Sequence, residues 1–189
     1  MLNLIVIGLI GMPGAGKGEC VHIALNAGFK VIQMGELVRA MTRYLGLDLT
    51  DENIGEVAHS EREKYGYGIW AERTLEEISK FNYRPDDMLI IDGIRGEAEL
   101  KIFRDAFGDR LKTIAIKMPD KKRFELLQQR NRSDAPMSWE DFIERDKRED
   151  KWGIKNALDD ADYIIFNTGT LSELKNEFRE LLINIQNNS

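Results

Sequence analysis

The stretch GMPGAGKG at residues 11–18 constrains the fold more than any other part of the chain. A run of apolar residues ends at Ile10, directly before it, and a segment compatible with a helix begins at about Lys17. A glycine-rich turn between a strand and a helix points backbone N–H groups and the positive end of the helix at a phosphate. Lys17 supplies a side-chain charge for the β- and γ-phosphates. The stretch therefore predicts a phosphate-binding loop.

The end of this loop departs from the common pattern, in which a serine or threonine that helps to hold magnesium follows the lysine. Here Gly18 follows Lys17, and Glu19 comes next. A carboxylate in the first turn of a helix is favoured by the helix dipole, which explains Glu19 without any function. Near a triphosphate it would repel, unless it is turned away or screened by magnesium. Both interpretations of Glu19 stay open.

The rest of the chain alternates short apolar runs with helical patterns, which predicts an α/β fold with right-handed crossovers. Five runs are rich in valine and isoleucine, as strands buried on both faces are: LNLIVIGLI, FKVIQM, DMLIIDG, LKTIAIKM and DYIIFN. The segments compatible with helices are 16–26, 36–45, 51–64, 69–81, 96–107, 120–130, 138–150 and 171–186. The helical stretch at 36–84 is longer than a simple crossover requires and predicts a substrate-binding insertion.

Composition narrows the classes of protein that this chain can belong to. A length of 189 residues suits one domain over residues 1–189. The single Cys20 and two separated histidines favour a reducing, cytoplasmic setting without a metal-ligand cluster. The apolar opening is too short for a membrane span. With 33 acidic and 27 basic residues, the net charge of −6 argues against bulk attraction to nucleic acid.

Two stretches resemble nucleoside monophosphate kinases of the adenylate kinase type. GMPGAGKG resembles their loop G-x-P-G-x-G-K-G, with Glu19 where they carry a threonine. VIQMGELVRA resembles their segment I-S-T-G-D-x-L-R-A, with Met34 in place of a threonine. The resemblance implies that Gly35 and Arg39 bind the phosphoryl acceptor. Arg43 lies on the same helical side, and we interpret it as a solvated residue.

The stretch LIIDGIRG resembles the L-L-D-G-F-P-R-T block of the same enzymes, shortened so that Arg95 follows Ile94 directly. An aspartate after four apolar strand residues is placed to bind Mg²⁺, in this case through water, which makes Asp92 the candidate metal residue. Arg95 can grip the phosphoryl acceptor bidentately. A purely structural Asp92 that caps the following turn is the alternative.

The stretch RFELLQQRNRSDAPMSWEDFIERDKRED predicts a helix, a short lid at 131–138 and another helix. Arginines flank this loop, and Arg145 and Arg148 share one helical face. Guanidinium groups over the transferring phosphoryl group would stabilise its growing charge. We therefore expect catalytic roles for Arg130, Arg132 and Arg145, although the neighbouring acids could pair with any of them instead.

The stretch ADYIIFNTGT resembles the closing strand and loop of dephospho-coenzyme A kinases, where the turn lies beside the adenine. Asn167, Thr168 and Gly169 are therefore candidate contacts to the base. Thr170 with Glu173 three residues later also reads as a helix cap, so structure alone could explain the turn.

Together these stretches resemble a largely archaeal group related to adenylate kinases and dephospho-coenzyme A kinases. The resemblance implies a P-loop three-layer fold whose five parallel strands have the order 2-3-1-4-5. It also implies use of ATP and Mg²⁺, with Lys17 and the arginines as catalytic residues. The residues expected to bind ATP are Gly11, Pro13, Gly14, Ala15, Gly16, Lys17, Gly18, Glu19, Asn167 and Gly169.

Three functions agree with these motifs. One is phosphorylation of a nucleoside monophosphate, and another is phosphorylation of a different small acceptor, such as dephospho-coenzyme A. The third is an ATP-hydrolysing switch that acts on a macromolecular partner. The sequence predicts neither the acceptor nor the oligomeric state, and no membrane association is expected.

Overall fold

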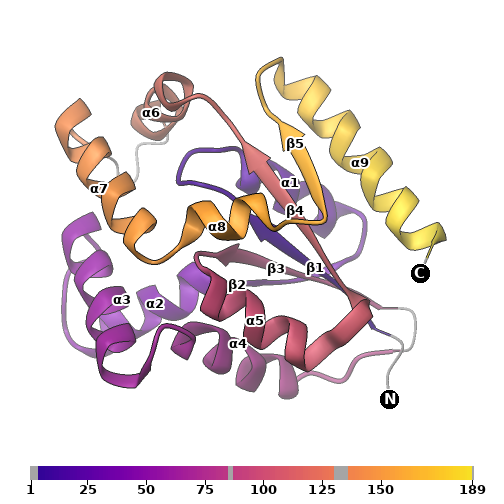
Figure 1. Ribbon diagram of the computed structural model, residues 1–189, viewed down its shortest axis with the longest axis horizontal. Helices are drawn as coiled ribbons and strands as arrows, with labels where there is room; N and C mark the ends of the chain where they lie inside the picture. The colour runs from indigo at the N-terminus through magenta and orange to yellow at the C-terminus, as the bar shows by residue number, and fades with distance from the viewer. Residues whose placement is uncertain (1–3, 85–86, 130–135, 189) are drawn as a thin grey trace.

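The computed structural model describes residues 4–84, 87–129 and 136–188. Its centre is a five-stranded sheet in which all neighbouring strands are parallel, with the order β2-β3-β1-β4-β5. The strands are β1 (Ile5–Ile10), β2 (Lys30–Gln33), β3 (Met88–Ile94), β4 (Leu111–Lys117) and β5 (Tyr163–Phe166). Figure 1 shows them running away from the side where the two termini lie. The predicted fold class and strand order are confirmed.

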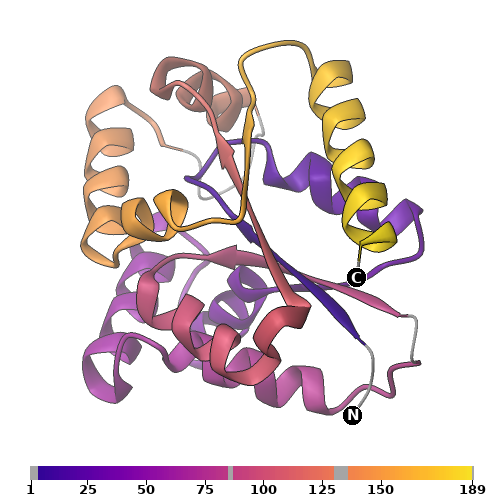
Figure 2. The ribbon, with the colours of Figure 1, turned by 45° about the vertical axis from the view of Figure 1, so that its right-hand side comes forward.

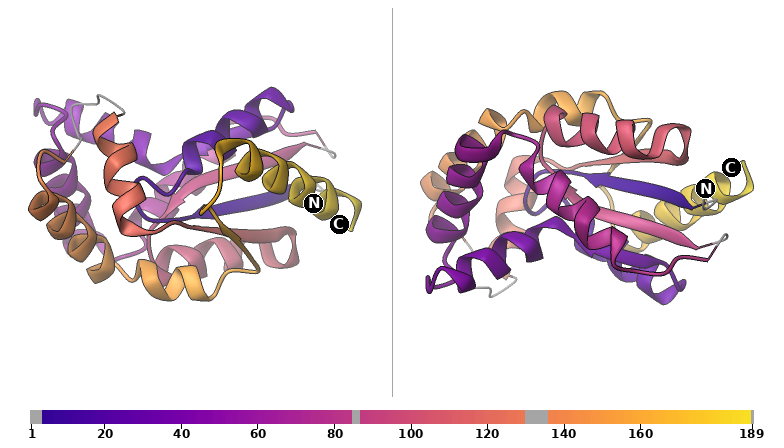
Figure 3. Two further views of the ribbon diagram at one scale, coloured as in Figure 1. Left: turned by 90° about the horizontal axis from the view of Figure 1, so that it is seen from above. Right: turned by 90° about the horizontal axis from the view of Figure 1, so that it is seen from below.

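The central strand β1 is buried on both faces, which explains why its sequence is almost continuously apolar. Ile7 and Leu9 pack in one core, together with the helices α1 (Lys17–Asn26) and α9 (Leu171–Asn187). Val6 and Ile10 pack in a second core on the opposite face. That core includes α4 (Ile69–Ser79), α5 (Glu97–Phe107) and α8 (Ile154–Asp159). Figures 2 and 3 show these helices as layers on the two sides of the sheet.

Two helical segments extend beyond the carboxyl ends of the strands. The first contains α2 (Met34–Tyr44) and α3 (Asp51–Tyr65), and the second contains α6 (Asp120–Gln129) and α7 (Trp139–Lys151). Figure 1 shows both segments on the side opposite the termini. Because parallel α/β sheets bind ligands at the carboxyl ends of their strands, this is the expected side for a site.

The structure differs from the sequence-based expectations in two places. Helix α2 begins at Met34, directly after β2, so Gly35 lies in its first turn rather than in a loop. Helix α8 was not expected, because its six residues are too few to show a helical pattern. Within the described ranges, no helix has the length and apolar character needed to cross a bilayer.

Candidate active site

A cleft of about 750 Å³ opens beyond the carboxyl ends of the strands. The phosphate-binding loop forms one end of it, and α2, α3, the end of β3 and α7 form the other walls. Most of the predicted site residues line this cleft: Pro13, Gly14, Ala15, Gly16, Lys17, Gly18, Glu19, Gly35, Arg39, Asp92, Arg95 and Arg145. Segments far apart in the sequence therefore meet around one space.

The loop conformation depends on glycines where it turns. Gly14 and Gly16 have φ angles of 84° and 106°, which L-amino acids with a side chain rarely adopt. A Cβ atom on Gly16 would also lie 2.5 Å from Nδ2 of Asn167. Amide groups at the start of a helix lie where a phosphate can bind, although the N–H group of Glu19 already donates to the carbonyl oxygen of Gly16 at 3.0 Å. The loop has the geometry of a phosphate cradle.

Lys17 lies inside the loop and is 8% exposed. Its Nζ donates hydrogen bonds to the carbonyl oxygens of Gly11 and, at 3.3 Å, of Met12. The ammonium group is thus held against the loop at the end of the cleft, where the sequence places the β- and γ-phosphates.

Asn167 supports the loop from behind. Its Nδ2 donates to the carbonyl oxygen of Ala15 at 3.0 Å, and its backbone N–H donates to that of Lys117 at 2.8 Å. Beyond it, Thr170 and Glu173 form a complete capping box at the start of α9. Asn167 thus holds the phosphate-binding loop in place through a hydrogen bond. The predicted contacts of Asn167, Thr168 and Gly169 with adenine stay predictions.

Glu19 turns toward α9, where its Oε2 lies 3.0 Å from Nζ of Lys175. This pairing compensates the charge of Glu19 beside the loop. The carboxylate is therefore compatible with a bound polyphosphate, because its own cation lies next to it.

Gly16 and Gly18 lie two positions apart, and we expect opposite effects when each is changed to alanine. Nothing lies within 4 Å of a Cβ atom on Gly18, and this residue lies in the first turn of α1. Gly18→Ala should therefore raise the free energy of unfolding by roughly 0.5 kcal/mol. Gly16→Ala should lower both the free energy of unfolding and the ATP affinity, because of its φ angle and the contact with Asn167. Urea unfolding and ATP calorimetry on the two variants measure these effects; a destabilised Gly18→Ala would contradict the open space at this position.

Asp92 lies at the carboxyl end of β3 and lines the cleft. Its Oδ2 accepts a hydrogen bond from Nε2 of Gln33 at 3.1 Å, whereas its Oδ1 is buried without a hydrogen-bond partner. Such an oxygen fits a hydrated Mg²⁺, which binds proteins through one or two carboxylates and takes its other ligands from water and phosphate. Among the described residues, no group of three or more histidine, cysteine, aspartate or glutamate side chains could hold a metal ion.

Arg95 follows β3 and contacts a buried carboxylate of α7. Its Nη1 lies 2.7 Å from Oε2 of Glu149, which is 4% exposed. Although burial alone lowers the pKa of Arg95, the charges of Glu149 and Asp92 raise it above the ordinary value. Arg95 therefore stays charged, but carboxylates already surround its charge.

The arginines of α7 reach across the cleft to α3. Asp51 in the first turn of α3 lies 3.2 Å from Nε of Arg145 and 2.7 Å from Nη2 of Arg148. Gly55, one turn later, makes room for this contact, because a Cβ atom there would lie 2.6 Å from Cζ of Arg148. Asp51 thus connects the insertion to α7 through both arginines.

Arg39 in α2 lies near a carboxylate of the same helix. Its Nη1 lies 3.9 Å from Oε1 of Glu36, whose side chain is 57% exposed, and Arg43 lies 3.8 Å from the same carboxylate. Gly35 lines the cleft beside them. Arg130, Arg132 and the first part of the predicted lid at 131–138 lie outside the described residues.

Sequence reasoning missed Arg123 as part of the loop support. This residue is 2% exposed, and its Nη1 donates to the carbonyl oxygen of Pro13 at 3.0 Å and to Oδ1 of Asp146 at 3.0 Å. It also lies over the ring of Phe142. Arg123 therefore connects the phosphate-binding loop to α7. No local sequence pattern in α6 distinguishes Arg123 from the other arginines of the chain.

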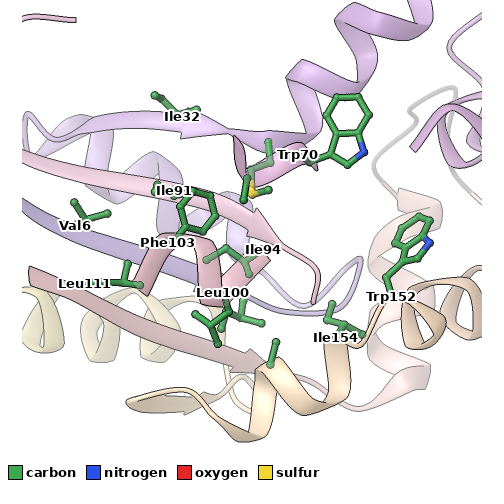
Figure 4. Packing of buried hydrophobic residues seen from close by; sticks show 14 of the residues in the cluster. Val6, Ile32, Trp70, Ile91, Ile94, Leu100, Phe103, Leu111, Trp152 and Ile154 are labelled. Atoms are coloured by element: carbon green, nitrogen blue, oxygen red, sulfur yellow. The ribbon is translucent and has the colours of Figure 1, made fainter. Parts of the chain in front are cut away.

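The apolar wall of the cleft was also missed. Trp70 of α4 and Trp152 after α7 line the cleft, and Figure 4 shows both indoles beyond the carboxyl ends of the strands, at one end of the core. Arg62 stacks over Trp152 and pairs with the buried Glu99, with 2.7 Å between Nη2 and Oε1. These two aromatic residues contribute an apolar part of the cleft wall.

Known proteins match this chain over most of its length. The model of the AAA domain family matches residues 10–142. A UPF0200 protein of Thermoplasma acidophilum is 41% identical over 177 residues, which are 94% of this chain and 94% of the relative. The chain belongs to the UPF0200 family. A UPF0200/UPF0201 protein of Archaeoglobus fulgidus is 39% identical over 188 residues, but the chain spans only 58% of that relative's length.

Solved structures of small-molecule kinases share the fold of this family member. A gluconokinase from Sinorhizobium meliloti has a TM-score of 0.62 at 14% identity, with 97% of this chain and 94% of the gluconokinase covered. A dephospho-CoA kinase from Campylobacter jejuni has a TM-score of 0.58 at 16% identity, with 98% of both chains covered. At such identities the likeness shows the fold alone, which is that of P-loop kinases. The predicted resemblance to this group is confirmed.

Proposed function

We propose that this protein is an ATP-dependent kinase that moves the γ-phosphoryl group of ATP to a small acceptor. One observation carries this proposal: the phosphate-binding loop and arginines from four other segments line one cleft. A phosphoryl transferase needs this arrangement, because positioning and charge stabilisation supply most of its catalysis. The kinase-like fold of the chain supports the same reaction class.

The donor would bind at the loop end of the cleft. The amides of the first turn of α1 would hold its phosphates, and Lys17 would contact the β- and γ-phosphates. Asp92 would hold Mg²⁺, which when bound neutralises charge on the phosphate oxygens. Arg145 would approach the transferring group from α7, and Arg130 and Arg132 are candidates for the same role.

The acceptor would bind in the other half of the cleft, between α2, α3 and the end of β3. Arg39 and Arg95 offer charges there, and the insertion at 36–84 provides most of the wall. The ATP-hydrolysing switch receives less support, because Lys175 compensates the charge of Glu19, the residue at which the loop departs from the kinase pattern.

The reaction class can be tested with ³¹P NMR of the protein mixed with MgATP and acceptor panels. One panel holds the four common nucleoside monophosphates, and another holds gluconate, shikimate and dephospho-coenzyme A. We expect loss of the γ-phosphate signal of ATP together with a new phosphorylated product in one panel. ATP that binds but is consumed only with a macromolecular partner would contradict the proposal and favour the switch.

A further inference from the structure

The phosphate-binding loop packs against the last helix of the chain. Figure 2 shows α9 beside α1, and the two helices are in contact. Where they meet, a Cβ atom on Gly16 would lie 3.2 Å from Cδ2 of Leu174. Lys175 is the next residue of α9, and it lines the same cleft as the loop. The first turns of α9 therefore bring a lysine to the end of the cleft where the donor would bind.

Lys175 forms an ion pair with Glu19, the residue at which the loop departs from the kinase pattern. Its Nζ lies 3.0 Å from Oε2 of Glu19. Both side chains are accessible, because that of Lys175 is 29% exposed and that of Glu19 is 42% exposed. Both residues also line the cleft. A ligand in the cleft can therefore reach the ammonium group of Lys175.

The charges at this end of the cleft show why a second cation matters. Lys17 contributes a positive charge inside the loop, but Glu19 and Asp92 contribute negative charges to the cleft wall. Mg²⁺ would offset the charge of Asp92, and Lys175 offsets that of Glu19. Among the described residues, Lys17 and Lys175 are the lysines that line the cleft.

Two roles of Lys175 agree with this arrangement. In the first, Lys175 neutralises Glu19 and does not contact a ligand. In the second, its ammonium group contacts both Glu19 and a phosphate oxygen of the donor. An ammonium group has three N–H donors, so one contact with a carboxylate oxygen does not use them all. The exposure of Lys175 and its place beside the loop favour the second role.

We propose that Lys175 binds a phosphate oxygen of the nucleotide donor while it stays paired with Glu19. With Glu19 in place of the threonine of the kinase loop that it resembles, this loop has no hydroxyl group at that position. Lys175 supplies from α9 a hydrogen-bond donor that the loop itself lacks. The proposal rests on the proposed kinase function and adds a residue that binds the donor.

The first test measures two ligands on one variant. Lys175→Gln removes the charge and keeps a polar side chain. Calorimetry in about 0.15 M salt, which screens exposed charges beyond about 8 Å, gives the affinity for MgATP, and competition gives that for inorganic tripolyphosphate. We expect both affinities to fall roughly 10- to 100-fold, the range for one hydrogen bond to a charged group.

Two results of this first test would overturn the proposal. An unchanged affinity for MgATP would show that Lys175 does not bind the donor. Tripolyphosphate has no nucleoside, so a loss for MgATP with no loss for tripolyphosphate would place Lys175 on the sugar or the base.

The second test separates a phosphate contact from simple neutralisation of Glu19. Lys175→Gln is made again in a Glu19→Gln protein, where no carboxylate needs to be neutralised. A direct contact should still lower the MgATP affinity roughly 10-fold or more, because the phosphate loses the same hydrogen bond. A smaller loss in this background would mean that Lys175 only neutralises Glu19, which would overturn the proposal.

The controls separate this contact from folding and from the kinase function. Lys101→Gln on α5 removes a lysine that also pairs with an acid, Asp105, but lies outside the lining of the cleft, so it should keep the wild-type affinity. Lys175→Arg keeps the charge and should recover most of the affinity. A wild-type protein that binds no MgATP would overturn the kinase function and this proposal together. MgATP that binds but is transferred to no acceptor would overturn the kinase function alone.

Discussion

Lys17→Ala should lower the turnover of ATP by roughly 100- to 1,000-fold, the usual effect of removing one preorganised charge from a transferring group. The ammonium group of Lys17 lies inside the loop and is held by the carbonyl oxygens of Gly11 and Met12. The ammonium group of Lys17 is therefore already in place before phosphate binds, and little free energy is lost in positioning it. Truncation to alanine removes this charge from the end of the cleft where the donor would lie.

The measurement for Lys17→Ala combines single-turnover kinetics with ATP calorimetry. Lys121→Ala, an exposed change on α6, is the matched control and should behave like the wild type. We expect near-native circular dichroism for both proteins, because water can reach the loop carbonyls that Lys17 leaves. Wild-type ATP affinity and turnover in Lys17→Ala would remove the main support for a nucleotide site.

The elements that could be predicted from the sequence are those specified by local patterns. The phosphate-binding loop follows from the glycines and Lys17, and the strands follow from apolar runs that match the buried faces of the sheet. The strand order came from the resemblance, since periodicity alone does not specify which strands are neighbours. Helix α8 gave no signal because six residues do not complete two helical turns.

The acceptor half of the cleft was harder to predict, because its pairs join distant segments. Asp51 and Arg148 are 97 positions apart, and in the sequence ERDKRED each charge could equally be solvated. One signal was available: Arg145, Arg148, Glu149 and Trp152 are spaced i, i+3, i+4 and i+7, which places them on one helical face. A buried aromatic residue on the same face as charges indicates that this face turns inward. Which carboxylate then meets which arginine depends on tertiary packing.

Arg123→Ala should lower the free energy of unfolding by about 3–5 kcal/mol, the range for breaking a buried ion pair by removing one partner. Arg123 is 2% exposed and connects three parts of the molecule: the loop at Pro13, Asp146 of α7 and Asp120 of its own helix. Its loss leaves Asp146, whose side chain is 14% exposed, without its guanidinium partner. The substitution removes both the ion pair with Asp146 and the connection between the phosphate-binding loop and α7.

Urea unfolding of Arg123→Ala, with Arg179→Ala on the exposed side of α9 as control, measures this effect. Arg123→Lys keeps the charge but not the planar fork that contacts Pro13 and Asp146 together, so it should recover only part of the stability. ATP affinity should fall in Arg123→Ala as well, because the Pro13 carbonyl loses its donor and the loop is less restrained. If Arg123→Ala unfolded within 1 kcal/mol of the wild type, the loop would have to be held by its other contacts, such as those of Asn167 and Lys17.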